Sequence, residues 1–154
     1  MTQFKFSVGP WNVHTGADAY GPATRKDIPI EEKFKKFAEI GFSAIQFHDD
    51  DAVPNINDYT EEEIKEKARE LKKTLDKYNL KAEFVAPRLW MDPHTQDGGF
   101  MSTSKEDREY AMWRAYRSID IANELGTDMI VLWLAREGTL CAESKSTSMG
   151  NQKC

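Results

Sequence analysis

The chain has 154 residues, of which 40% are hydrophobic and 31% are charged, and its formal net charge is −5 at pH 7. This length corresponds to one average domain with a single apolar core. No apolar run approaches the roughly 20 residues that cross a bilayer, which excludes an integral membrane protein. The acidic balance argues against nucleic acid as a partner, because phosphate binding needs a basic face.

Two further features bear on the compartment. The N-terminal residues contain no apolar stretch typical of a secretory signal, which predicts a cytoplasmic protein. The only cysteines are Cys141 and Cys154, so the sequence predicts free thiols rather than a disulfide framework.

Short apolar runs alternate along the chain with longer amphipathic segments. In chain order, strands are expected at residues 4–8, 44–47, 81–86 and 129–134, and helices at residues 30–41, 60–78 and 103–125. Capping-box patterns, Thr60 with Glu63 and Thr103 with Glu106, predict where the second and third helices begin.

The joints between these elements repeat. Gly41, Asn79 and Gly126 each end a helix shortly before a strand, a pattern typical of βαβ units and a parallel sheet. The run Met129–Leu134 is the most continuously apolar, so we expect a strand buried on both faces. Residues 143–154 are polar and without periodicity, which predicts a disordered tail.

Aromatic residues follow several of the expected strands. Trp11, Trp90 and Trp133 lie at or just beyond strand carboxyl ends, whereas Trp113 lies on a helix and is expected to pack there. In parallel α/β folds, ligands bind at the carboxyl ends of the strands. Each tryptophan alone could be structural, but three converging ones favour a pocket that stacks on a sugar ring.

The segment after the second strand combines His48 with three aspartates. Asp51 can accept the Nδ1–H of His48, which would leave Nε2 facing the crevice as an acid, a base or a hydrogen-bond partner. The competing interpretation is a surface acidic loop. Metal binding by residues 49–51 alone is disfavoured, because adjacent side chains in extended chain point to opposite sides. The sequence also contains no CxxC, HExxH, P-loop or GxGxxG motif.

Taken in order, several motifs resemble the N-terminal part of the xylose isomerase family, over residues 4–145. They are Trp11, the segment 20–25 (YGPATR), Phe47-His48-Asp49-Asp50-Asp51, Pro54, Asp97-Gly98-Gly99-Phe100, and Trp133 with Arg136-Glu137-Gly138. The sequence departs from the family at Pro87-Arg88, where small polar residues are usual.

The resemblance implies a (β/α)8 TIM barrel, of which residues 1–142 would form the N-terminal half, with four parallel strands and three main helices. It implies a homotetrameric aldose–ketose isomerase that uses two divalent cations (Mg²⁺, Mn²⁺ or Co²⁺) and converts D-xylose to D-xylulose, or glucose to fructose, by ring opening and a 1,2-hydride shift. His48 and Asp51 match the ring-opening pair. Trp11 and Trp133 match pocket walls, and Trp90 stands where the family places a phenylalanine, so all three are expected to bind the substrate. Tyr20 matches an aromatic residue that reaches the neighbouring subunit's site.

The family's metal ligands lie on later strands and have no counterpart here, so no metal ligand is expected in this chain. Strand starts near residues 4, 44, 82 and 129 imply roughly 320 residues for eight units, about twice this length. We therefore expect a fragment that is inactive alone. Two alternatives stay open, namely another sugar isomerase or epimerase on the same barrel, and a non-catalytic half-barrel that binds sugar or associates through its open edges.

Overall fold

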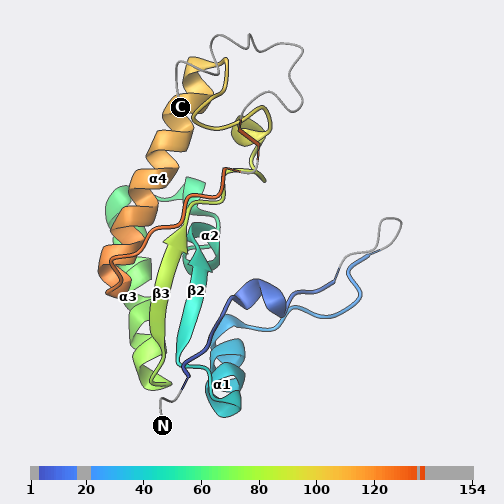
Figure 1. Ribbon diagram of the computed structural model, residues 1–154, viewed down its shortest axis with the longest axis vertical. Coiled ribbons are helices and arrows are strands. Elements are labelled where there is room, and N and C mark those ends of the chain that lie inside the picture. The colour runs from blue at the N-terminus through green and yellow to red at the C-terminus, as the bar shows by residue number, and fades with distance from the viewer. Residues whose placement is uncertain (1–3, 17–21, 135, 138–154) are drawn as a thin grey trace.

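In the computed structural model of the protein, which describes residues 4–16, 22–134 and 136–137, helices cover a parallel sheet (Figure 1). The strands are β1 (Ser7–Val8), β2 (Ala44–His48) and β3 (Lys81–Ala86). The helices are α1 (Ile30–Ile40), α2 (Asp49–Ala52), α3 (Glu61–Lys77) and α4 (Lys105–Leu125), with short 3-10 helices η1 (Pro10–Asn12), η2 (Ile56–Asp58) and η3 (Pro93–Thr95).

The sheet has the order β1-β2-β3, and both neighbouring pairs are parallel. This confirms the α/β class expected from the alternating pattern. Helix α1 packs on β2 through Phe34, whose ring meets that of Phe47 edge-on with centroids 6.0 Å apart. On α3, the buried residues recur at helical spacing and complete the core; they are Ile64, Ala68, Leu71 and Leu75.

Local signals placed α1 and α3 correctly. Gly41 ends α1 in the left-handed conformation with φ 103°, and its N–H donates to the carbonyl of Phe37 at 3.2 Å. Thr60 and Glu63 form the expected capping box at the start of α3.

The expected start of α4 was wrong by one residue. The N-cap is Ser104, whose Oγ accepts from the backbone N–H of Asp107 at 3.3 Å, rather than Thr103 paired with Glu106. The side chain of Asp107 is also held by Ser102 at 3.1 Å and by His94 at 2.8 Å. These contacts fix Asp107 in the first turn and so select Ser104 as the cap.

The fourth strand is not formed as expected. In the residues that the structure describes, only Ile130 bridges to Val85 in parallel fashion, and the segment 129–134 runs beside β3 without forming a ladder (Figure 1). Burial on both faces was also wrong, because Met129, Leu132 and Leu134 are 49–52% exposed. No described residue pairs with the outer edge of this segment.

The first strand is shorter than expected. Only Ser7 and Val8 pair with β2, and Phe4 and Phe6 are exposed at 81% and 63%. Ser7 also belongs to a polar network across one face of the sheet. Gln46 Nε2 donates to Ser7 Oγ and to Glu83 Oε2, each at 2.9 Å. The predicted tail and both cysteines lie outside the described residues.

Candidate active site

The carboxyl ends of the strands bring separate segments to one edge of the sheet. Trp11 lies in η1 directly after β1, and His48 is the last residue of β2 and leads into α2. Arg88 and Trp90 follow β3, and Trp133 follows the bridge at Ile130. The structure thus brings His48 and the three tryptophans predicted from the sequence to the same edge of the sheet, together with Arg88.

The three tryptophans form a continuous row with the imidazole. Ring centroids are 4.4 Å apart for Trp11 and His48, 5.2 Å for His48 and Trp90, and 5.8 Å for Trp90 and Trp133. Trp133 is 62% exposed, so one end of the row is open to solvent. Such a row offers apolar faces on which the C–H surface of a sugar can pack.

His48 and Asp51 contact each other as the sequence predicts. Nδ1 of His48 lies 2.9 Å from Oδ2 of Asp51, and the backbone N–H of His48 donates to the same oxygen at 3.2 Å. The His48 residue is only 9% exposed, which restricts its ring to this orientation. The pair is therefore built into the β2–α2 junction rather than into a loose surface loop.

The conformation assumed for the aspartate run was wrong. Residues 49–51 form the first turn of α2 instead of extended chain, so their side chains fan out around a helix. Three carboxylates in a first turn suit the positive end of the helix dipole. Each then finds a different partner.

Asp49 points into the core and is fully buried. Arg114 of α4 binds it through two hydrogen bonds, from Nε to Oδ2 at 2.5 Å and from Nη2 to Oδ1 at 2.6 Å. Burial alone would lower the pKa of Arg114, but the hydrogen bonds to Asp49 outweigh it and raise the pKa. This ion pair joins α4 to α2, the helix that carries Asp51, and the sequence did not indicate it.

Arg88 is a second residue that the sequence analysis did not assign to the site. Its Nε donates to Asp50 at 2.7 Å, and its Nη2 lies 3.2 Å from Asp51 Oδ1 and 3.0 Å from His48 Nδ1. Burial raises the pKa of Asp50, and the hydrogen bond from Arg88 opposes that rise. The only signal in the sequence for this contact was that Arg88 follows one strand and the acidic run 49–51 follows the neighbouring strand.

Comparison with known protein families matches residues 34–148 to the xylose isomerase-like TIM barrel. The chain belongs to this family. The family includes sugar isomerases and epimerases as well as AP endonucleases. The resemblance found in the sequence is thereby confirmed at the level of the family and its barrel fold.

Two motifs of the resemblance meet in space at this edge of the barrel sheet. The carboxylate of Glu137 accepts three backbone N–H groups, from Gly99 at 2.9 Å, Phe100 at 2.7 Å and Met101 at 2.8 Å. A Cβ on Gly99 would lie 3.0 Å from the Cβ of Ala111, so the close approach there favours glycine. Arg136 Nε donates to the carbonyl of Trp90 at 3.3 Å, which ties these motifs to the aromatic row.

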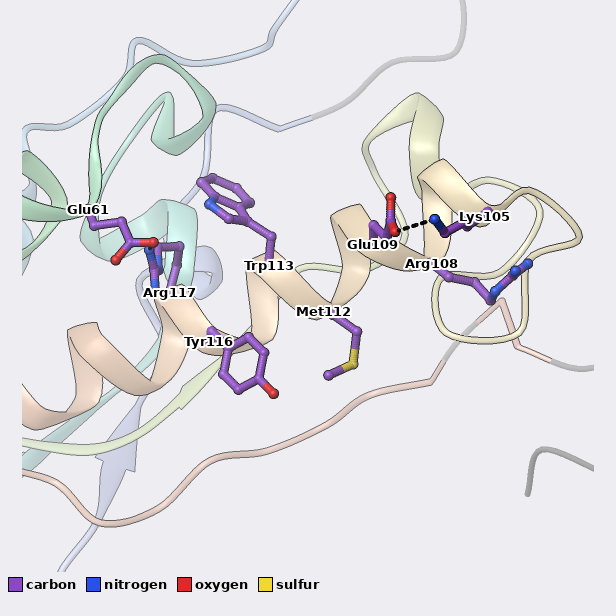
Figure 2. A pocket seen from close by; sticks show the side chains of 8 residues that line it. All are labelled: Glu61, Lys105, Arg108, Glu109, Met112, Trp113, Tyr116 and Arg117. Carbon is purple, nitrogen blue, oxygen red and sulfur yellow. Dashed lines mark ion pairs between the residues drawn. The ribbon is translucent and has the colours of Figure 1, made fainter.

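Two hollows lie on different faces of this barrel-type unit. A cavity of about 600 Å³ is lined by Trp11, Asp51 and Arg88 among others, whereas His48, Trp90 and Trp133 do not line it. A hollow of about 510 Å³ lies on the outer face of α4, where Lys105 pairs with Glu109 (Figure 2). None of the site residues expected from the sequence lines the second hollow.

The described residues do not fit the two divalent cations that the resemblance implies. Within residues 4–16, 22–134 and 136–137, no three His, Cys, Asp or Glu side chains form a group that could hold a metal ion. The three aspartates of α2 are instead engaged by Arg114 and Arg88. What these residues can do themselves is bind a ligand against the tryptophans and exchange hydrogen bonds at His48.

Two other expectations concern the surroundings of the site. Tyr20, expected to reach a neighbouring subunit, lies outside the described residues. No helix in the part of the chain that the structure describes is both long enough and apolar enough to cross a membrane.

Proposed function

We propose that the chain provides the sugar-binding and ring-opening part of an aldose–ketose isomerase, with D-xylose as substrate and D-xylulose as product. The observation that carries this proposal is the row Trp11–His48–Trp90–Trp133 with Asp51 bound to the imidazole. Aromatic faces beside a polarised imidazole suit a substrate that has both a C–H surface and a ring oxygen.

In this proposal the residues have separate roles. The tryptophans form the walls that hold the sugar, and Asp51 orients the imidazole so that Nε2 is directed at the ring oxygen. When Nε2 carries a hydrogen, its hydrogen bond to that oxygen favours opening of the ring. The roles proposed for the described residues end at ring opening. For the active enzyme we further propose two divalent cations and a tetrameric assembly.

The alternatives within the family differ in ligand. An AP endonuclease acts on DNA, and a net charge of −5 does not favour a polyanion. Arg88, where the xylose isomerase family has a small polar residue, favours as second candidate an isomerase or epimerase of another sugar. A panel of pentoses, hexoses and sugar phosphates separates the two sugar enzymes.

Calorimetric titration tests the proposal. We expect saturable binding of D-xylose and xylitol, loss of binding in Trp90→Ala, and no specific binding of a duplex that contains an abasic site. A coupled assay should show no isomerisation by the 154-residue chain with Mg²⁺, Mn²⁺ or Co²⁺. Binding of the duplex without binding of either sugar or polyol would contradict the proposed function.

A further inference from the structure

Arg88 is held in place independently of its side chain. It lies two residues beyond β3 and follows the buried Pro87, whose ring restricts the backbone. The backbone N–H of Arg88 donates to Asp49 Oδ1 at 3.0 Å, and Asp49 is itself fixed by Arg114. The backbone from which the Arg88 side chain extends is therefore fixed.

From there the guanidinium reaches the polar and aromatic members of the site. It contacts Asp50 and Asp51, and its central carbon lies 5.7 Å from the centroid of the Trp90 ring. The side chain is 20% exposed, so it is largely shielded from water. These contacts together hold the guanidinium between the aspartates and His48.

The Nδ1 atom of His48 therefore faces two opposite partners. Asp51 Oδ2, an acceptor, lies at 2.9 Å, and Arg88 Nη2, a donor that stays protonated, lies at 3.0 Å. Nδ1 of a neutral imidazole carries either a hydrogen or a lone pair, so only one of these contacts can be a hydrogen bond at a time. With a hydrogen on Nδ1, Nε2 is an acceptor; with a lone pair on Nδ1, Nε2 is a donor.

Neither choice leaves the other partner without a hydrogen bond. When Nδ1 accepts a hydrogen bond from Arg88, Asp51 Oδ2 still accepts the backbone N–H of His48 at 3.2 Å. When Nδ1 donates to Asp51, Arg88 Nη2 still donates to Asp51 Oδ1 at 3.2 Å. Both tautomers are thus compatible with one arrangement of heavy atoms, since no buried group loses its last partner.

We propose that Arg88 is a positioning residue that gives neutral His48 access to the tautomer with hydrogen on Nε2. In that form Nε2 of the neutral ring carries a hydrogen and can donate it to a ligand, whereas Asp51 alone would leave a neutral Nε2 as an acceptor only. The consequence for catalysis rests on the proposed function, in which Nε2 donates to the ring oxygen of a sugar. The tautomer itself is a property of the protein without ligand.

The other two histidines supply internal references. Nδ1 of His14 accepts from the backbone N–H of Gly16 at 2.9 Å, which places its hydrogen on Nε2. Nδ1 of His94 lies 2.8 Å from Asp107 Oδ1, and none of the described residues offers a competing donor, which places a hydrogen on Nδ1. One spectrum therefore contains both limiting cases beside His48.

The test is a long-range ¹H–¹⁵N correlation spectrum of the ¹⁵N-labelled chain, recorded at an alkaline pH at which the imidazole signals of all three histidines have stopped changing with pH, so that every ring is neutral. For His94 this pH lies above the ordinary range, because Asp107 raises its pKa. We expect the Nδ1 shift of wild-type His48 to lie between those of His14 and His94. Arg88→Met should move it to the value of His94, and Arg88→Lys, which keeps a donor, should restore part of the difference. The shifts of His14 and His94 should not change.

The wild-type spectrum can overturn the inference by itself, whatever the variants do. If the Nδ1 shift of His48 coincides with that of His94, Asp51 alone sets the tautomer and Arg88 does not. Titration of the same sample with xylitol tests the proposed function separately. If xylitol does not bind while the Nδ1 shift of His48 is intermediate, the proposed function is contradicted and the role of Arg88 in setting the tautomer is retained.

Discussion

Asp49 and Arg114 show how much the site depends on one buried contact. The side chains of Asp49 and Arg114 are 0% and 5% exposed, and the guanidinium also donates to the hydroxyl of Tyr110 at 3.0 Å. Removing one partner of a buried ion pair leaves the other charge without compensation, which is more costly than the net contribution of the pair. The pair therefore fixes α2, and with it the position of Asp51.

We expect Asp49→Asn to lower the free energy of unfolding by about 3–5 kcal/mol, as is typical for breaking a buried pair. Urea denaturation followed by circular dichroism measures this change. The control is Lys105→Ala, which breaks the exposed pair with Glu109 and should change the free energy by about 0.5 kcal/mol or less. A loss below about 1 kcal/mol in Asp49→Asn would contradict a structural role for the pair.

His94 responds to pH through Asp107. The hydrogen bond to Asp107 raises the pKa of His94 above its ordinary value, and the charge of Glu106 adds a smaller upward contribution. A group whose pKa is raised on folding stabilises the protein fully at a pH below its pKa in the unfolded state. This stabilisation is lost as the pH rises through its pKa in the folded state.

Asp107→Asn should therefore lower the pKa of His94. It should also reduce the free energy of unfolding that the protein gains when the pH falls through the pKa of His94. Titration of the imidazole by NMR, with thermal unfolding across the same pH range, measures both effects. Glu106→Gln is the matched control and should lower the pKa of His94 less. Equal effects of the two variants would show that general charge, rather than the hydrogen bond, causes the shift.

Among the helices, local sequence signals predicted the position of each helix better than its exact ends or its buried face. Of the apolar residues at helical spacing on α4, Ala122 and Leu125 are buried, but Met112, Tyr116 and Ile119 are at least 43% exposed. The core face of α4 carries Arg114 instead, because Asp49 accepts its charge. An apolar pattern cannot reveal a buried charge whose partner lies 65 residues away in the chain.

The start of α4 gives a test at single-residue resolution. Ser104→Ala should lower the free energy of unfolding by about 1 kcal/mol, since it removes the N-cap acceptor, while Thr103→Ala should change it by about 0.5 kcal/mol or less. Chemical denaturation of both variants measures the difference. The reverse order would mean that the helix begins at the residue that the sequence pattern indicates.

The candidate site was predictable where chain order alone determines position. The carboxyl ends of parallel strands lie at one edge of the sheet, so the sequence alone places Trp11, Trp90 and Trp133 near His48. The roles of Arg88 and Asp49 could not, because they depend on which way neighbouring side chains turn within α2. The fourth strand was overestimated because an apolar run signals burial but does not supply a pairing partner.

At the scale of the whole molecule, both edges of the sheet expose apolar side chains. Phe4 and Phe6 flank β1, and Leu132 and Leu134 are exposed on the segment beside β3. Open edges with apolar residues favour pairing with another chain. We expect the purified chain to associate at increasing concentration.

Replacing Leu132 and Leu134 by lysine should shift this association toward monomer, because charged side chains discourage edge pairing. Size-exclusion chromatography with light scattering measures the mass of the wild-type chain and of the double variant. The same substitutions at exposed Met112 and Tyr116 on α4 serve as the control. A monomeric wild-type chain, or an equal effect of the control, would exclude association through this edge.

The most direct test of the central claim uses the four tryptophans of the chain. Titration of the ¹⁵N-labelled protein with xylitol should shift the indole N–H signals of Trp11, Trp90 and Trp133 with one saturating curve. The signal of Trp113, which lies on α4 and stacks on Tyr110, should stay in place. If the four signals move together or none saturates, the row around His48 is not a sugar-binding site.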